Sequence, residues 1–492
     1  MSIRIPRALI FAAAFIIALV LYWPAINGTP IWDDFSFWFT DPVITSDTPY
    51  SVIWKNYSWP VSVTFQKFLY GLWEKEYIYY HVFNLFLHFA NTLLVFKLGR
   101  LLRFKYPVFF SLLFLFHPSA VIATAWMVQL KTLLSFFFAL SSIFLYLKGT
   151  KKSQWWMLPS WLLFAASVTS KSASLTLPVI LIFVHLRRNG FKKFYILIPF
   201  FLISGWNAYM ILKSPVTLEG TEKAAISKTL KELPKPEVTE LPDRPEVTQT
   251  PMEIDPLPGI TTPPKEMPGE KNTLSFLGLN IKLVSQTMYY YFWQVVLPLR
   301  NEPVKGLNFN RPGFDEIMHV IFLILLVIIF WKDSGLIYLG AGHFLLIPFL
   351  GFIPAPYMNI SWVSDQHLYL ALPALLAFWM RVIDKIEWKH TYVIPAAFVL
   401  FFTYKTWKAT PMYKDQFVFY EKSLEYNVYN VPIAYNLGYA HLMRGDWPLA
   451  YNVLSETFKL SKEEPLIRNN IFFPYLAYLY FQLKHSVENH EN

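Results

Sequence analysis

Two adjacent carboxylates, Asp33 and Asp34, are the residues whose types and position most directly indicate chemistry. They stand between Trp32 and Phe35, shortly after an apolar run at 8–24 that is long enough to cross a bilayer. A charged side chain at membrane depth costs about 2.5–3.5 kcal/mol at a helix centre, so acids at such a boundary tend to be functional. The alternative interpretation is the start of a hydrated loop, in which the acids cap backbone groups.

The composition is that of an integral membrane protein. Of the 492 residues, 54% are hydrophobic and only 15% are charged, against about 25% charged residues in soluble domains. Aromatic residues make up 19%, which suits many helix ends in interfacial belts. Much of the net charge of +10 lies in short loops that set topology, so no nucleic-acid partner is expected. The absence of cysteine excludes disulfides, thiolate metal sites and a cysteine nucleophile.

Hydropathy predicts an all-α, polytopic membrane fold. We expect about eleven transmembrane helices, at 8–24, 80–98, 107–127, 130–148, 155–170, 174–189, 194–212, 315–331, 334–353, 366–382 and 391–408. Lysine and arginine gather in alternate loops, which predicts a cytoplasmic amino terminus, an uncleaved first span and an extracytoplasmic carboxyl terminus. The aromatic stretch 275–300 is interpreted as an interfacial or re-entrant helix on the outer face; counting it as a span would give twelve.

Four regions follow from this topology. An amino-terminal half, 1–212, contains the first outer loop, 25–79, with both acids. A Pro-rich insertion, 213–275, lacks apolar periodicity and is predicted to be disordered. The interfacial helix and the carboxyl-terminal spans occupy 276–408.

The fourth region, 409–492, is predicted to be a tetratricopeptide-like helical tail. Gly438 and Ala450 supply small residues where two helices would cross, with 415–427 and 470–483 as flanking helices. Stable arrays need about three repeats or a cap, so a short array is expected to lean on the membrane domain. A generic helical hairpin pair is the alternative.

Several motifs occur in a characteristic order along the chain. They are Trp32-Asp33-Asp34, the segment from Tyr80 to Asn91, His117-Pro118, the segment from Ala125 to Ser135, Ser170-Lys171, and the segment from Asp365 to Leu370, followed by the tail. This ordered set resembles the transmembrane-and-tetratricopeptide-containing protein O-mannosyltransferases and their bacterial relatives, which are polytopic glycosyltransferases of the GT-C type. The resemblance covers nearly the whole chain apart from the insertion.

The resemblance implies a membrane glycosyltransferase that uses a polyprenyl-phosphate-linked sugar donor on the non-cytoplasmic face, in a bacterial inner membrane. Its acceptor would be a hydroxyl, on protein Ser or Thr, presented by the tail. Asp33 matches the family's general base best and Asp34 second. The chemistry agrees, because an attacking hydroxyl must lose a proton and a carboxylate within hydrogen-bond reach can take it.

The donor phosphate requires positive charge and hydrogen-bond donors. Lys131 and Lys171, near the outer ends of spans, are the candidates, with a lysine snorkelling to the interface as the alternative. The remaining candidate substrate-binding residues are His81, His117, Asp365 and His367. Asp365 and His367 begin a span on the predicted outer side and could complete a divalent-cation site, so metal dependence is left open.

One helix carries four polar residues, His81, Asn84, His88 and Asn91, at spacings that place them on a single face. In a bilayer this face turns toward the protein interior or a cavity. Interhelical hydrogen bonding is as good an explanation as a role in the site. His81 lies nearest the outer boundary and is the preferred candidate among the four.

The chain departs from the family pattern at three positions. Trp59 stands where arginine is expected before Pro60, Gln366 where arginine is usual, and Ser172 where glutamate often follows the lysine. Arginine holds phosphate with a bidentate fork, so the phosphate pocket is the weaker half of the site. The alternatives are a different donor, a loss of activity, or substitution by other basic residues, namely Lys55, Lys67 and Arg300.

Two other functions are compatible with the sequence. A non-catalytic envelope scaffold would use the tail to bind partners and the spans as an anchor. A transporter would line a path with the His and Asn face, but paired broken helices or inverted repeats are not evident in the sequence.

Overall fold

The computed structural model describes most of the chain. The described residues are 6–213, 275–276, 279–299, 302–305, 335–351, 360–361, 363–426, 430–463 and six helical residues between 476 and 484. The predicted span at 315–331, nearly all of the insertion and most of the last tail helix lie outside them.

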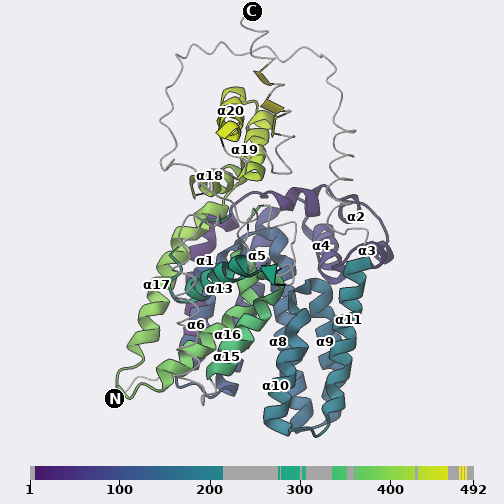
Figure 1. The fold of residues 1–492 in the computed structure, drawn as a ribbon, viewed down its shortest axis with the longest axis vertical. Coiled ribbons are helices and arrows are strands. Elements are labelled where there is room, and N and C mark those ends of the chain that lie inside the picture. The colour runs from purple at the N-terminus through teal and green to yellow at the C-terminus, as the bar shows by residue number, and fades with distance from the viewer. Residues whose placement is uncertain are drawn as a thin grey trace, which may run out of the picture.

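The described part is almost entirely helical (Figure 1). Its longer helices are α1 (Arg7–Ile26), α3 (Tyr50–Asn56), α4 (Pro60–Trp73), α5 (Tyr77–Leu101), α6 (Pro107–Leu115), α7 (Val121–Ala125), α8 (Leu130–Lys151), α9 (Met157–Ser170), α10 (Leu177–Asn189), α11 (Ile198–Lys213), α13 (Ile281–Val296), α15 (Gly335–Leu346), α16 (Asp365–Asp384), α17 (Val393–Ala409), α18 (Gln416–Tyr426), α19 (Val431–Arg444) and α20 (Trp447–Glu463).

Shorter elements connect these helices. They are the four-residue helix α2 (Pro42–Thr45), the π-helical turn η1 (Phe35–Phe39), and the 3₁₀ turns η2 (Pro118–Ala120), η3 (Met127–Gln129), η4 (Gln154–Trp156), η5 (Ser172–Thr176), η6 (Phe194–Leu197), η7 (Ile347–Phe349) and η9 (Thr410–Tyr413). Two strands, β1 (Ser275–Phe276) and β2 (Leu279–Asn280), pair antiparallel, with Phe276 opposite Leu279.

Five helices in the described part are long and apolar enough to cross a membrane, in agreement with a membrane protein. They are Arg7–Ile26, Tyr77–Leu101, Met127–Lys151, Phe194–Ile211 and Asp365–Asp384. The predicted spans at 155–170, 174–189, 334–353 and 391–408 are helical but hold at most 17 residues in one α-helix. The prediction of eleven spans is therefore not confirmed.

The span predicted at 107–127 is not one continuous helix. α6 and the following pair η2–α7 meet at a 51° bend, so this segment is a broken span or a re-entrant loop. The break falls at His117-Pro118, where proline has no N–H to donate to the preceding turn. If the bent pair is one span, the described part contains six.

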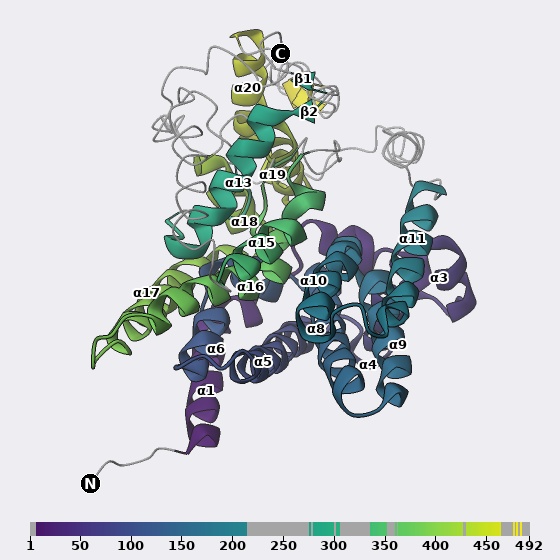
Figure 2. The same ribbon diagram turned by 60° about the horizontal axis from the view of Figure 1, so that its bottom comes forward.

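Two basic loops meet at one end of the bundle. The backbone N–H of Lys105 donates to Asp384 Oδ1 at 3.0 Å, and the Arg381 guanidinium lies 5.7 Å from the Phe104 ring. The loop after α5 and the end of α16 are therefore neighbours, as their positive charges predicted. The start of α1 and the α19–α20 pair lie at opposite ends of the molecule (Figure 2).

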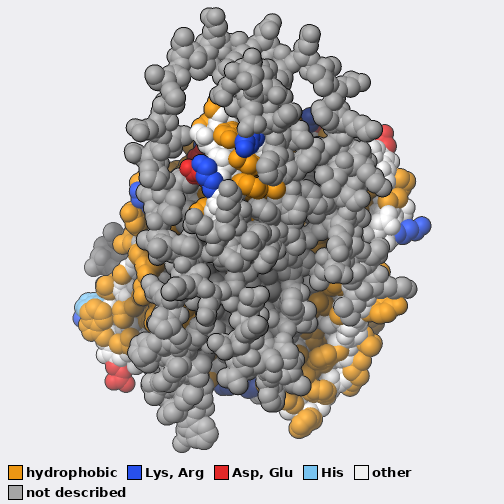
Figure 3. All heavy atoms as spheres, turned by 45° about the horizontal axis from the view of Figure 1, so that its top comes forward, with side chains coloured by type: hydrophobic (Ala, Val, Ile, Leu, Met, Phe, Trp, Pro, Cys, Tyr) orange, Lys and Arg blue, Asp and Glu red, His pale blue; other side chains and the backbone are white. Residues whose placement is uncertain are grey.

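The buried side chains form two clusters. The larger runs through α1, α5–α8, α13, α16 and α17 and continues into α18–α20, so the tail shares one core with the membrane helices. The smaller cluster lies among α8–α11, which stand together to one side of the other helices in Figure 2. Hydrophobic side chains also lie along the outer flanks (Figure 3), and exposed Leu9, Val20 and Leu202 on α1 and α11 suit contact with lipid tails.

The tail begins directly on the bundle. α17 ends at Ala409, η9 follows, and α18 packs against η9 and α19. In the α19–α20 pair, a Cβ at Gly438 would lie 2.7 Å from Leu454, so the close helix crossing requires glycine there. Gly445 ends α19 in the left-handed conformation, with φ at 85°.

Candidate functional site

The turn that carries the acids is strained and held in place by aromatic rings. Trp32, six residues after α1 ends, has φ at 45°, a conformation that a bulky side chain rarely adopts. Such a residue costs about 1–3 kcal/mol and persists only where its surroundings fix it. Its ring lies 6.3 Å from Trp126, 6.2 Å from Phe419 and 6.0 Å from Tyr420, centroid to centroid.

Asp34 has a structural role in this turn. It is fully buried, and its Oδ2 accepts the backbone N–H of Ile31 at 2.9 Å while Oδ1 accepts that of Val128 at 2.7 Å. The indole N–H of Trp126 donates to the Ile31 carbonyl at 3.1 Å, so the turn is tied to the segment before α8. Burial raises the pKa of Asp34 to about 8, although both hydrogen bonds favour its carboxylate form.

Asp33 differs from its neighbour in exposure and in hydrogen bonding. Its side chain is partly exposed, and it makes no hydrogen bond within the described part of the chain. Desolvation by its surroundings raises the pKa of Asp33, and the Lys131 ammonium lowers it again in part. A carboxylate without a protein partner, beside a cation, is free to accept a proton from a bound hydroxyl.

Two lysines lie beyond Asp33, at the start of α8 and the end of α9. Lys131 Nζ stands 4.7 Å from the centre of the Trp59 ring, a cation–π distance. Lys171 Nζ donates to Thr132 Oγ1 at 2.8 Å and to Gln129 Oε1 at 3.4 Å. Trp59, the position where arginine was expected, thus contacts one of the two candidate lysines.

His367 joins this group from α16. Its ring lies within electrostatic range of both lysines, Lys171 and Lys131, and stacks on Phe349 with 4.0 Å between ring centroids. The fold therefore places Asp33, Lys131, Lys171 and His367 around one site, although they are separated by more than 330 positions in sequence. We call these four residues the outer site.

Three of the four polar residues on α5 connect neighbouring elements. Asn84 Nδ2 donates to the carbonyls of Trp126 and Met127, each at 3.3 Å. His88 contacts the Tyr369 hydroxyl at 2.7 Å, and Asn91 donates to that hydroxyl at 3.2 Å. These contacts are the interhelical hydrogen bonds that the sequence left as one explanation of the polar face.

His81, the fourth residue of that face, is buried beside the backbone of Ala125. Neither ring nitrogen has a well-formed hydrogen bond within the described residues. Buried polar groups are nearly always paired, so His81 remains a candidate for contact with a ligand.

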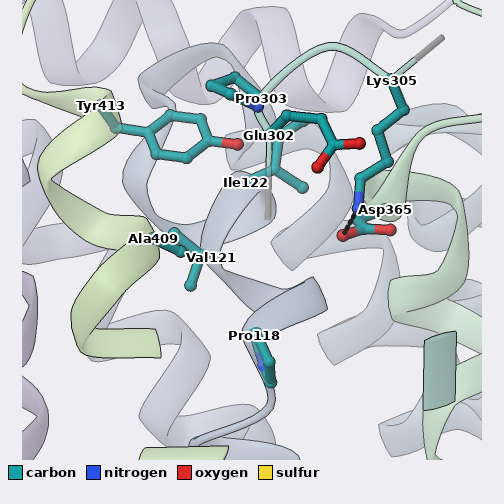
Figure 4. A pocket seen from close by; sticks show the side chains of 9 residues that line it. All are labelled: Pro118, Val121, Ile122, Glu302, Pro303, Lys305, Asp365, Ala409 and Tyr413. Atoms are coloured by element: carbon teal, nitrogen blue, oxygen red, sulfur yellow. Dashed lines mark ion pairs between the residues drawn. The ribbon is translucent and has the colours of Figure 1, made fainter. Parts of the chain in front are cut away.

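Asp365 lies in a second cluster, drawn in Figure 4. Its Oδ1 accepts the Tyr290 hydroxyl at 2.8 Å, and its Oδ2 accepts Gln294 Nε2 at 3.1 Å and pairs with Lys305 Nζ at 2.9 Å. The carboxylate of buried Glu302 points between the Tyr413 ring and the Lys305–Asp365 pair (Figure 4). A cavity of about 10 Å³ lies among these groups, close to the size of one water molecule.

His117 also belongs with this second cluster. Its Nδ1 accepts the backbone N–H of Ser119 at 3.2 Å, and its Nε2 donates to the Val295 carbonyl at 3.1 Å. It therefore caps the short turn after the break and ties it to α13. No hydrogen bond or ion pair joins Asp365 or His117 to Asp33 in the described part of the chain.

Of the basic residues suggested as substitutes, the two that the structure describes do not join the outer site. Lys67 Nζ is used by the carbonyls of Val43 and Ser46, Lys55 is exposed on α3, and Arg300 lies outside the described residues. Among the described side chains, no group of three His, Asp or Glu residues is arranged to hold a metal, so the structure assigns no metal ligands.

Sequence reasoning missed several residues around both clusters. Gln129 and Thr132 beside Lys171 carried no signal apart from their place in a motif. Glu302 and Lys305 are charged residues directly after an aromatic helix, and that isolated charge could have marked them. Tyr420 in the tail could not have been connected with Asp33 from sequence, because about 390 positions separate them.

No protein family model matches the chain, and no curated protein or solved structure shows a significant match to it.

Proposed function

We propose that this protein is an integral-membrane glycosyltransferase of the GT-C type. It transfers a sugar from a polyprenyl-phosphate-linked donor to an acceptor hydroxyl, on protein Ser or Thr, at the non-cytoplasmic face of a bacterial inner membrane. The proposal rests on the ordered motifs in the sequence. The observation that carries it is the Asp33 carboxylate, which lies near Lys131 and has no hydrogen-bond partner among the described residues, with Lys171 and His367 in the same outer site.

Each group in the outer site suits one part of the reaction. Asp33 takes the proton of the acceptor hydroxyl as the hydroxyl oxygen forms a bond to the anomeric carbon. The bond from that carbon to the phosphate oxygen breaks, and polyprenyl phosphate leaves with the bonding electrons. Lys131 and Lys171 stabilise the negative charge on the phosphate, and a leaving phosphate needs no strong acid.

The tail is assigned to the acceptor. The close packing of Gly438 on Leu454 supports a tetratricopeptide-like hairpin, in which small residues stand at the helix crossing. The position of the α19–α20 pair at the opposite end of the molecule from the start of α1 supports a tail on the non-cytoplasmic side (Figure 2). An acceptor protein bound there would meet the outer site from the aqueous side.

The test is sugar transfer by the purified full-length chain in lipid nanodiscs with a series of radiolabelled polyprenyl-phosphate sugars. We expect transfer from one donor by the wild type and by Asp47→Asn, an exposed acid in the same loop, and none by Asp33→Asn. Equal turnover by Asp33→Asn and the wild type would remove Asp33 from the mechanism. A wild type inactive with every donor would reject the proposed activity.

A non-catalytic scaffold is the second candidate, and one observation favours it. The Trp59 ring already contacts Lys131, and Lys171 already has two hydrogen-bond partners, so the cations have protein contacts before any phosphate binds. Mass spectrometry of the protein purified from membranes separates the two candidates. Co-purified polyprenyl phosphate supports the transferase, whereas a lipid-free protein that still captures partners through its tail supports the scaffold.

A further inference from the structure

The first helix of the tail covers the turn that carries Asp33. Phe419 and Tyr420 of α18 are buried, and both rings stand edge-on to Trp32, at interplanar angles of 67° and 68°. Phe419 also lies 5.7 Å from Trp126, the ring stacked on the other side of Trp32. The residue before Asp33 is thus enclosed by rings from the bundle and from the tail.

Backbone contacts hold the two segments together as well. The N–H of Thr29 donates to the Lys414 carbonyl at 2.8 Å, and a Cβ at Gly28 would lie 2.5 Å from that same oxygen. Only glycine allows the first outer loop to approach the start of the tail this closely. The Thr410 hydroxyl adds a hydrogen bond to the Leu21 carbonyl at 2.7 Å.

Trp32 needs such support, because its left-handed backbone is unfavourable for a bulky residue. The hydrogen bonds of Asp34 fix the backbone directly after Asp33, and the rings of α18 fix Trp32, directly before it. If the rings of α18 no longer packed on Trp32, Trp32 would return to an ordinary conformation and the Asp33 carboxylate would turn with it.

We propose that Tyr420, with Phe419, is a positioning residue for Asp33: α18 completes the outer site by holding Trp32 in its left-handed conformation. The tail thereby has a second role besides binding the acceptor, and its first helix is part of the transfer machinery. This inference rests on the proposed function, in which Asp33 is the base. It does not require Tyr420 to touch either substrate.

The charged groups around Asp33 determine how this role can be measured. Asp34 faces it from the same turn, Lys131 from α8 and Tyr420 from α18. Burial, with a smaller contribution from the two acids, raises the pKa of Tyr420 above its ordinary value, so its hydroxyl is uncharged at neutral pH. Tyr420 therefore acts on Asp33 through the packing of its ring on Trp32 and not by its own charge.

The first experiment measures sugar transfer against pH for the purified full-length chain. Tyr420→Ala should lower kcat at least tenfold and leave KM for the donor within twofold. The acidic limb of kcat against pH should move to lower pH, because an Asp33 carboxylate that turns into water loses its raised pKa. Tyr420→Phe keeps the ring and should restore both kcat and the limb. Tyr426→Ala removes an exposed tyrosine from the same helix and should match the wild type.

Two results would overturn the inference. One is an unchanged kcat and an unchanged acidic limb of the pH profile in Tyr420→Ala. The other is an equal loss of kcat in Tyr420→Phe and Tyr420→Ala, which would assign the effect to the hydroxyl. If Tyr420→Ala does not yield folded protein, Tyr420→Leu replaces it, because leucine keeps the apolar bulk without a flat ring.

A second experiment does not depend on activity. The chain contains no cysteine, so Asp33→Cys introduces a single thiol at the base position. Its rate of labelling by a membrane-impermeant maleimide should rise at least fivefold when Tyr420→Ala is added and stay unchanged with Tyr426→Ala. An unchanged rate with Tyr420→Ala would contradict the positioning role. If the wild type transfers no sugar, the proposed function fails, while the labelling rates still decide whether α18 covers this turn.

Discussion

The molecule contains two clusters of buried or partly buried charge, and their difference indicates which one is available for chemistry. In the outer site, Asp33 has no hydrogen-bond partner among the described residues, and the cation that acts on it is Lys131 on another element. In the second cluster, Asp365 receives two hydrogen bonds and an ion pair. A fully satisfied carboxylate fixes structure, whereas an unsatisfied one has capacity left for a substrate.

The same difference separates the adjacent acids. Asp34 accepts two backbone N–H groups and holds the turn, while Asp33 makes no hydrogen bond to any residue that the structure describes. In the proposed mechanism, Asp34 therefore supplies the geometry and Asp33 the reactive group. The following variants test this division, in order of decreasing expected effect.

The largest contrast is between Asp33→Asn and Asp365→Asn in the transfer assay. A general base contributes about 10²–10⁴-fold to a rate, so Asp33→Asn should lose at least a hundredfold in kcat. Asp365→Asn should retain most of its kcat when the rate is expressed per folded molecule. Equal losses in kcat per folded molecule would mean that the two clusters do not differ in function.

The second contrast concerns stability. Removing one partner of a buried ion pair leaves an uncompensated charge and costs about 3–5 kcal/mol. Lys305→Met should therefore lower the melting temperature sharply, because Asp365 stays buried without its cation. Lys131→Met, on the partly exposed side of the outer site, should change it much less. A larger loss with Lys131→Met would contradict the assignment of the second cluster to structure.

A smaller effect is expected for Asp34→Asn. The amide can accept only one of the two N–H groups, so either Ile31 or Val128 is left with a buried, unpaired donor. The cost is about 1–3 kcal/mol and should appear in the free energy of unfolding. Asp33→Asn should leave that free energy nearly unchanged, and a comparable loss there would indicate a hidden structural role.

The smallest effect is a shift in pH dependence. Lys131 lowers the pKa of Asp33, so Lys131→Met should raise that pKa. A base must be deprotonated to act, and the acidic limb of kcat should therefore move to higher pH in this variant. The rate-against-pH profile measures it. A limb that stayed in place or moved to lower pH would show that Lys131 does not act on Asp33.

Part of this arrangement could be predicted from the sequence. The apolar lengths predicted the five spans because burial in a bilayer leaves little choice of conformation. The unusual position of the acid pair beside a span also marked the site. His117-Pro118 marked a break, since proline cannot continue the hydrogen-bond ladder, but the 51° bend itself depends on packing against α13 and α16.

The division of roles between Asp33 and Asp34 could not be predicted. It depends on a backbone N–H at Val128, 94 positions away, and on a left-handed Trp32 that no local preference of tryptophan indicates. The separation of Asp365 from His367 is a similar case. These two residues are two positions apart on one helix, yet they belong to different clusters. Only their interactions with Lys305, Lys131 and Lys171 reveal this separation.

The most direct test of the account is binding of polyprenyl phosphate to the purified protein, followed by native mass spectrometry. In the proposed mechanism, the lysines bind the phosphate and Asp33 removes the proton. Wild type and Asp33→Asn should therefore bind the lipid equally, and the double variant Lys131→Met, Lys171→Met should lose binding. Failure of the wild type to bind, or undiminished binding by the double variant, would contradict it.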